Sequence, residues 1–469
     1  MREHFDFYGY NGPTDGKYYA DDEVYTYGED YRTVKRFKEY KDVGFNISLL
    51  QHHNAYVGEK WETSACKKCM DVAYKAGIDK VIVSDERLKD LCKEELLVGE
   101  NGKFKSEEEL LSFIDDCSKN YRNHPAFYGL QLHDEPIYKY LKEYGHVYKA
   151  IKKVIPNAEL QCNLLNMCLP WGINKDEQAG DMYKDFPEYL NAFVDYSGID
   201  YLMTDEYAFR RNNSISPWTM PTYQLLADVC KKRGVEMRLV MQSFTQEACV
   251  VSKKNPDQVE GSIAWRRMTE KDMYWQMNLA MGFGCKEYSF FTYFVKQHKH
   301  FNAKWAGSAG VDGGTFINLD GTRTRLYYYT KRIIAEMKEF EPVLIKYDFD
   351  NAYFFFPEGK KAADFEMTSK AILTDNKNIP ISVKTERDPI IVTELKNGES
   401  RLYMVENIGN TFDELMYKIR PKKVEINLGE LSNSAKVYHK GKLLNRDLSS
   451  GKLTEKLGMG QALFIEIER

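Results

Sequence analysis

Short apolar runs alternate with amphipathic stretches over about the first 340 residues of this chain. Several runs are continuous in Val, Ile, Leu and Phe, which is typical of strands that are buried on both faces. Alternation of strand and helix patterns indicates βα units and a parallel sheet. We place eight strands at His4–Tyr10, Val43–Leu50, Lys80–Ser84, Phe127–His133, Glu159–Leu164, Ile199–Thr204, Met237–Gln242 and Cys285–Tyr293.

Helix signals lie between these strands. Ser106 and Glu109 form a capping box for a helix that runs towards Tyr121, and Thr269 with Asp272 begins another. A left-handed residue is favoured where a helix ends before a strand. The glycines at such places are Gly44, Gly77, Gly198, Gly234 and Gly284. Eight strands without a glycine-rich nucleotide motif favour an α/β fold of the (β/α)8 TIM-barrel type over a doubly wound sheet.

The pattern changes near Pro342. From about Tyr347 the apolar residues alternate with period two and turn residues separate the runs, which is typical of an antiparallel β-sandwich. The predicted strands include Ala352–Phe356, Ile390–Glu394, Arg401–Glu406, Lys423–Leu428, Ala435–Tyr438 and Ala462–Ile467. We therefore expect a barrel domain over residues 1–344 and a C-terminal β-sandwich over residues 345–469.

Composition narrows the class of partner and compartment. The net charge of −4 is small for 469 residues, so we expect neither nucleic acid nor a membrane as a partner. Nine cysteines without framework spacing indicate a reducing compartment, and Cys66 and Cys69 lack the further ligands of a zinc site. The sequence shows neither a signal peptide nor an apolar run of roughly 18 residues, which predicts a soluble, cytoplasmic protein.

The most informative run is Phe127–Pro136, in which a buried strand stops at Asp134, Glu135 and Pro136. In a (β/α)8 barrel the carboxyl ends of the strands form the catalytic face. Two neighbouring acids at that face are suited to cleavage of a glycosidic bond, which usually requires two carboxyl groups in different environments. The 33 tyrosines fit this reading, because Tyr combines a flat apolar face with a polar tip.

The run His133–Pro136 resembles the end of strand four in clan-A glycoside hydrolases, the superfamily of β-galactosidases, β-mannanases and cellulases. Three further segments are similar in character to parts of β-galactosidase-like enzymes: Glu287–Tyr293, Ile317–Thr324 and Gly460–Ile467. The resemblance implies a barrel followed by a β-galactosidase-like sandwich. It also implies that Glu135 is the general acid/base.

Two positions depart from the clan pattern. Gln242 stands at the end of strand seven, where the clan has a nucleophilic Glu, and Asp134 stands where the clan has Asn. A neutral amide cannot attack an anomeric carbon, so the second carboxyl group has to come from elsewhere. Strand six ends in Asp205 and Glu206, and we leave the choice between them open.

Other polar and aromatic residues at strand ends are candidates for binding substrate. Gln242 either donates to a sugar hydroxyl or is a satisfied core amide, Tyr207 is placed to reach the second carboxyl group, and Tyr10 is placed at the floor. Trp171 and Trp218 lie in loops and suit stacking on a sugar ring. The full set of substrate-binding candidates is Tyr10, His53, Asn54, His133, Asp134, Tyr207, Gln242 and Trp305.

The sequence therefore predicts a glycoside hydrolase that cleaves a β-linked bond in an oligosaccharide, without a cofactor or a metal and with the oligomeric state open. One alternative is a carbohydrate-binding relic of a glycosidase that has lost catalysis. A second is a metal-dependent sugar isomerase or epimerase barrel, since acids and His at strand ends also suit a divalent metal. A third is substrate-assisted hydrolysis of an N-acetylated sugar supported by Asp134 and Glu135.

Overall fold

The structure is a computed structural model of the whole chain. It describes residues 2–20, 23–26, 28–178, 180–210, 213–251, 259–294, 315–318, 320–365, 372, 376–377, 379–411 and 420–468.

Parallel strands form a closed (β/α)8 barrel from two four-stranded sheets. The first sheet is β4 (Ile47–Leu50), β5 (Lys80–Ser84), β6 (Phe127–Asp134) and β7 (Glu159–Asn163). The second is β8 (Tyr201–Glu206), β9 (Glu236–Gln242), β12 (Glu287–Phe291) and β1 (Asp6–Gly9). One seam is closed where Leu164 pairs with Thr204, and the other where the Asn46 amide donates to the Phe7 carbonyl at 3.0 Å. The predicted fold class is confirmed, with strand ends differing by a few residues.

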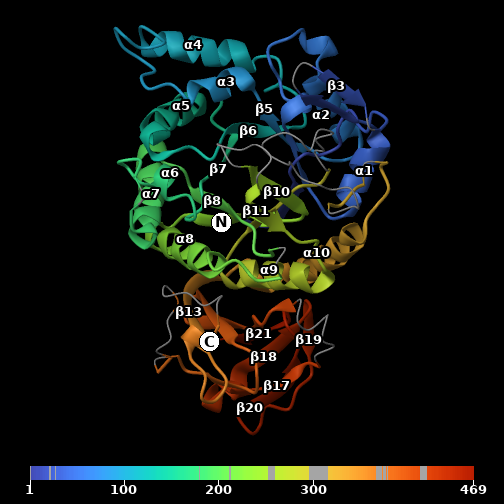
Figure 1. Cartoon of the computed structure of the whole chain (residues 1–469), viewed down its shortest axis with the longest axis vertical. Helices are drawn as coiled ribbons and strands as arrows, with labels where there is room; N and C mark the ends of the chain where they lie inside the picture. Colours follow the sequence, from blue (N-terminus) through green and yellow to red (C-terminus); the bar gives the residue numbers. More distant parts are fainter. Residues whose placement is uncertain are drawn as a thin grey trace.

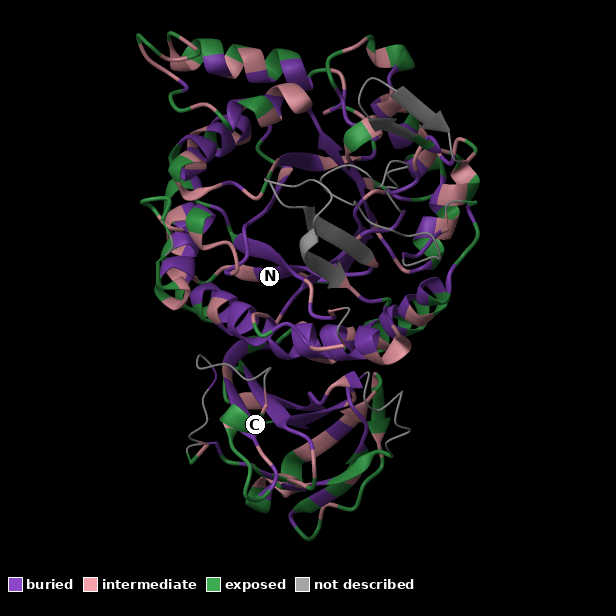
Figure 2. Ribbon diagram, in the orientation of Figure 1, coloured by how far each residue is buried: buried purple, intermediate pink, exposed green. Residues whose placement is uncertain are grey.

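Helices surround the barrel (Figure 1). They are α1 (Val34–Asp42), α2 (Ala65–Lys75), α3 (Glu86–Leu91), α4 (Glu107–Ser118), α5 (Leu141–Val154), α6 (Pro170–Ile173), α7 (Met182–Ser197), α8 (Thr219–Arg233), α9 (Glu270–Gly282) and α10 (Arg325–Leu344). Ser106 and Thr269 are the N-caps of α4 and α9, as predicted. Purple, buried residues dominate the inner sides of this ring in Figure 2. Within the described ranges, no helix is both long enough and apolar enough to span a membrane.

The C-terminal part is antiparallel, as predicted. Its larger sheet has the order β13 (Asp348–Phe355), β15 (Ile390–Asn397), β16 (Ser400–Asn407), β21 (Ala462–Ile467), β18 (Ala435–His439) and β19 (Lys442–Leu444). The smaller has β14 (Ser382–Thr385), β17 (Lys422–Asn427) and β20 (Lys452–Leu457). Residues such as Tyr353, Ile426 and Ile465 share one apolar core between the sheets. The domain boundary between residues 344 and 345 stays a prediction.

Two hairpins were not predicted from the sequence. One consists of β2 (Lys17–Ala20) and β3 (Glu23–Thr26), the other of β10 (Gln246–Val251) and β11 (Val259–Trp265). The second hairpin follows strand β9 and is drawn across the centre of the barrel ring in Figure 1. Its last residue, Trp265, pairs with Arg210 in the loop after β8, so the hairpin is attached to the carboxyl-end face of the barrel.

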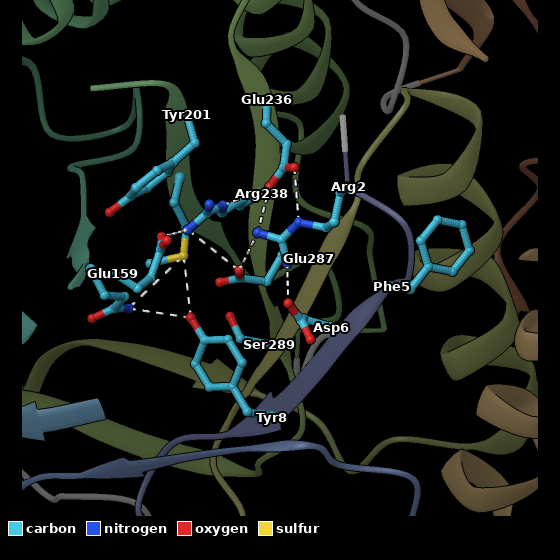
Figure 3. Close-up of polar contacts among 12 residues, drawn as sticks. Arg2, Phe5, Asp6, Tyr8, Glu159, Tyr201, Glu236, Arg238, Glu287 and Ser289 are labelled. Atoms are coloured by element: carbon cyan, nitrogen blue, oxygen red, sulfur yellow. Dashed lines mark hydrogen bonds and ion pairs between the residues drawn. The ribbon is translucent and has the colours of Figure 1, made fainter. Parts of the chain in front are cut away.

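The opposite end of the barrel is lined by ion pairs (Figure 3). Arg2 contacts Glu287 at 3.0 Å, and Arg238 contacts Glu236 at 2.7 Å and lies 3.6 Å from the centre of the Tyr201 ring. Glu236 and Glu287 are the first residues of their strands, so this cluster marks the amino-terminal floor. In (β/α)8 barrels this end serves stability, whereas chemistry belongs to the other end.

A buried lysine joins the barrel to the C-terminal sheets. The Lys286 Nζ donates to the carbonyl oxygens of Leu344 at 3.2 Å, Ile345 at 3.3 Å and Tyr347 at 2.5 Å. Burial lowers the pKa of Lys286 to about 8. The ammonium group lies against the last turn of α10, where a positive charge complements the helix dipole.

Candidate active site

Strand β6 ends irregularly at the two acids. Its pairing with β7 shifts register between Gln131 and His133, and Glu135 adopts a left-handed backbone with φ of 53°. In a regular strand, successive side chains would point to opposite faces. The irregular end gives both Asp134 and Glu135 access to the barrel mouth. A strained backbone of this kind is often found at functional sites.

Glu135 is held in its protonated form. Its side chain is half-buried, and burial, together with the charges of Asp205 and then Asp134, raises the pKa of Glu135 to about 9. Burial of its carboxyl group also raises the pKa of Asp134, although the residue as a whole is exposed. Asn163 opposes that rise by donating to Asp134 Oδ1 at 3.2 Å. At neutral pH the site therefore holds a proton on Glu135.

The structure separates the two acids at the end of β8. Asp205 is buried, and burial raises its pKa to about 7 against the opposing effect of Tyr207. The Glu206 carboxylate instead accepts from the Thr219 hydroxyl at 3.0 Å, at the first residue of α8. The charges that act on Glu135 are those of Asp205 and Asp134. Of the two candidates, Asp205 is the one whose charge acts on Glu135.

Gln242 is a satisfied core amide. It is fully buried, its Oε1 accepts from the Phe209 amide at 2.9 Å, and its Nε2 lies 3.3 Å from the carbonyl oxygens of Phe209, Phe244 and Arg266. Both ends of the amide bind backbone. Of the two roles predicted for Gln242, the structure therefore favours a satisfied core amide over a contact with substrate. The Gln242 side chain joins the loops after β8 and β9.

Tyr10 and Tyr207 lie beside the carboxyl groups. Burial raises the pKa of Tyr10, and Asp134 and Asp205 add to the rise, while its hydroxyl accepts from Gln161 at 2.7 Å. The Tyr207 hydroxyl acts directly on Asp205 and lowers the pKa of that acid. The substrate-binding roles of Tyr10 and Tyr207 stay predictions.

The remaining candidates are placed less centrally. His53 is half-buried in a short 3-10 helix (His52–Asn54), and Asn54 donates to the Pro13 carbonyl at 3.0 Å. His133 Nδ1 donates to the Asp134 carbonyl at 2.7 Å, and burial lowers its pKa. Trp305 lies outside the described residues.

Three site residues were missed from the sequence: Asn163, Asn166 and Cys168. All belong to the end of β7 or the loop after it, and Asn166 Nδ2 donates to Asp205 Oδ1 at 3.4 Å. The only signal in the sequence is their position after an apolar strand, and many loop residues share that position. Within the described residues, no group of three or more His, Cys, Asp or Glu side chains is arranged to hold a metal ion.

Comparison with known proteins supports the fold. No protein-family model matches the chain, and no curated protein sequence does. A family 5 glycoside hydrolase from Bacteroides vulgatus ATCC 8482 superposes with a TM-score of 0.50 at 10% identity, covering 99% of this chain and 88% of that one. A further structure, described as a glycoside hydrolase, gives a TM-score of 0.49 at 10% identity and covers 99% of this chain and 92% of that one. The chain thus shares its fold with the family 5 glycoside hydrolase.

Proposed function

We propose that this protein is a glycoside hydrolase in which Glu135 is the general acid and Asp205 is the nucleophile or base. One observation supports this most directly: two interacting carboxyl groups whose environments set their pKa values near 9 and near 7. Pairs of acids whose surroundings separate their pKa values are the usual sign of an acid and base assignment.

These two pKa values determine which carboxyl group carries a proton at a given pH. Asp205 loses its proton first as the pH rises, while Glu135 keeps its own. Glu135 then donates that proton to the oxygen of the leaving group as the glycosidic bond breaks. Asp205 either attacks the anomeric carbon or takes a proton from an attacking water. A separation of roughly 5–5.5 Å between the carboxyl groups corresponds to retention, and roughly 6.5–9.5 Å to inversion.

The leaving group lies on the side of Glu135. Helix α6 packs there, because Gly172 lies within van der Waals distance of Ile137, two residues beyond Glu135. Trp171 on the same helix is 52% exposed. An exposed indole at this place suits stacking on a second sugar ring. We infer a short β-linked oligosaccharide as substrate.

The test is hydrolysis of aryl galactoside, glucoside, mannoside, xyloside, arabinoside and N-acetylglucosaminide, with and without EDTA. Release from one of them should be insensitive to EDTA. Glu135→Gln should lower turnover of poor leaving groups on the order of 100-fold or more. Glu188→Gln is the matched control, since Glu188 is exposed on α7. Full activity in Glu135→Gln would remove this residue from the mechanism.

A carbohydrate-binding relic is the second candidate, favoured by the structural use of Gln242 at the end of strand seven. It predicts silence across the whole panel together with saturable sugar binding by calorimetry. Release of the N-acetylglucosaminide alone would instead support substrate assistance, in which Asp134 holds the acetamido group. Loss of activity in EDTA would support the metal-dependent alternative.

A further inference from the structure

We propose that Asn166 is a positioning residue that selects Asp205 as the ionised carboxyl group of the site, and that Cys168 locks Asn166 in the required orientation. The inference rests on the proposed function only for the role given to Asp205. The contact itself, and its effect on the ionisation of Asp205, can be measured without any turnover.

The orientation of the Asn166 amide follows from its neighbours. Its Oδ1 accepts from the backbone N–H of Cys168 at 3.1 Å and from the Cys168 thiol at 2.6 Å. A backbone N–H can only donate, so the oxygen has to face it. The Nδ2 group then faces the other way and donates to Asp205 Oδ1 at 3.4 Å. Asn166 is only 9% exposed, so rotation into solvent is restricted.

This donor acts where the surroundings favour a neutral acid. The ionisable groups that act on or face Asp205 are Asp134, Glu135, Glu206, Tyr10, Tyr207 and Cys168, with Arg210 acting on Glu206. Burial and the charges of Asp134 and Glu206 raise the pKa of Asp205, whereas Tyr207 and Asn166 lower it. A hydrogen bond to the charged form favours ionisation. Asn166 is therefore one of two neutral donors that keep Asp205 able to ionise near neutral pH.

The position of the Asn166 side chain relative to Asp205 is fixed by the backbone of the two four-stranded sheets. Asn166 belongs to the loop after β7, and Asp205 belongs to β8 in the other sheet. Next to this contact the Leu164 amide donates to the Met203 carbonyl at 2.9 Å, and the Thr204 hydroxyl donates to the Leu164 carbonyl at 2.9 Å. Two hydrogen bonds across the seam thus set the distance between Asn166 and Asp205.

The Cys168 thiol holds Asn166 in place and does not titrate over the pH range in which Asp205 and Glu135 do. Burial, with the nearby charges of Glu206, Asp205 and Glu135, raises the pKa of the Cys168 thiol to about 12. The thiol therefore stays protonated and keeps donating to Asn166 while Asp205 and Glu135 change their charge.

The first test is the pH dependence of kcat/KM. In Asn166→Ala the rising limb, which reports ionisation of Asp205, should move about one pH unit upward, because a donor to the charged form is lost. Asn166→Asp should move it further, since a carboxylate would face Asp205. Cys168→Ala should give a smaller upward shift, and Cys168→Ser should restore the wild-type limb. Asn174→Ala is the matched control, since Asn174 donates to Asp185 at 2.8 Å in the same loop region.

The second test needs no activity. The loss of melting temperature caused by Asn166→Ala should be larger at pH 9 than at pH 5, and this pH dependence should disappear in the Asp205→Asn background. An equal loss at both pH values, or an unchanged rising limb with a uniformly lower rate, would overturn the inference and leave Asn166 a merely structural residue. If the wild type hydrolyses nothing, the proposed function fails, while the melting experiment still decides the inference.

Discussion

At the scale of single residues, Glu135 and Asp205 differ in what opposes their burial. Asp205 has Asn166 and Tyr207 as donors, which favour its charged form. Glu135 has burial and two acidic neighbours acting on it in the same direction. The difference in neighbours, rather than in residue type, assigns one group to hold a proton and the other to release it.

This asymmetry predicts a bell-shaped pH dependence. The value of kcat/KM should rise as Asp205 loses its proton near pH 7 and fall as Glu135 loses its proton near pH 9. The falling limb should flatten for an aryl glycoside with a good leaving group, which needs little protonation. Measuring both profiles checks the assignment. An identical falling limb for good and poor leaving groups would show that Glu135 is not the proton donor.

The residue scale also shows where sequence reasoning reaches its limit. Acids at the ends of apolar strands were predicted because strand position is a local pattern. The contact between Asn166 and Asp205 joins residues 39 apart along the chain, and its donor sits in a loop without periodicity. For Gln242, strand position was predicted correctly, but the carbonyl groups around its amide come from loops and hairpin ends that carry no pattern.

At the scale of elements, the end of β9 is built for packing. The Gln242 side chain binds backbone groups from the loop after β8, the chain just beyond β9 and the segment after β11. The strands and helix caps were predictable because hydrophobic period and cap residues are local signals. The β10–β11 hairpin was not predictable, because its two strands pair with each other outside the barrel sheets and do not alternate with helices.

Restoring an acid at this position should therefore harm the protein. In Gln242→Glu a carboxylate oxygen would replace the Nε2 donor and face the carbonyl oxygens of Phe209, Phe244 and Arg266. We expect a fall in melting temperature of about 2–5 °C at pH 8, without a gain in hydrolysis. Scanning fluorimetry and the aryl glycoside assay check this together. A rise in activity would show that the clan position for the nucleophile is still usable.

At the scale of the whole molecule, the site costs stability. The Glu135 pKa is raised from an ordinary 4.5 to about 9, so between those values the folded state binds more protons than the unfolded state. Stability contributed by this group therefore falls as the pH rises through that window, and Asp205 acts with the same sign. At the opposite end of the barrel, burial also raises the pKa of Glu287, and the charges of Arg238 and Arg2 oppose this rise.

Neutral substitutions in the site should raise stability in alkaline solution only. An amide mimics the protonated acid, so Glu135→Gln and Asp205→Asn should each melt about 2 °C or more above the wild type at pH 9. At pH 4 the difference should largely vanish for Glu135→Gln and shrink to a small remainder for Asp205→Asn. Both wild-type groups are then protonated in the folded state, while in the unfolded chain most of Glu135 but less than half of Asp205 is protonated. Melting curves at both pH values decide this, with Glu188→Gln expected to match the wild type throughout. A stabilisation that persists at pH 4 would trace to packing rather than to charge.

The two-sheet construction of the barrel has one more consequence. Glu135 stands on the sheet β4–β7, and Asp205 stands on the sheet that begins with β8. Neither sheet carries both of the proposed catalytic residues, so the proposed pair is assembled where the two sheets meet within a single chain, much as some dimers assemble their sites between subunits. The hydrogen bonds between the two sheets at Leu164 and Thr204 then hold these two carboxyl groups at a fixed separation. A substitution that lets the two sheets move relative to one another would alter the reaction while leaving the structure of each sheet intact.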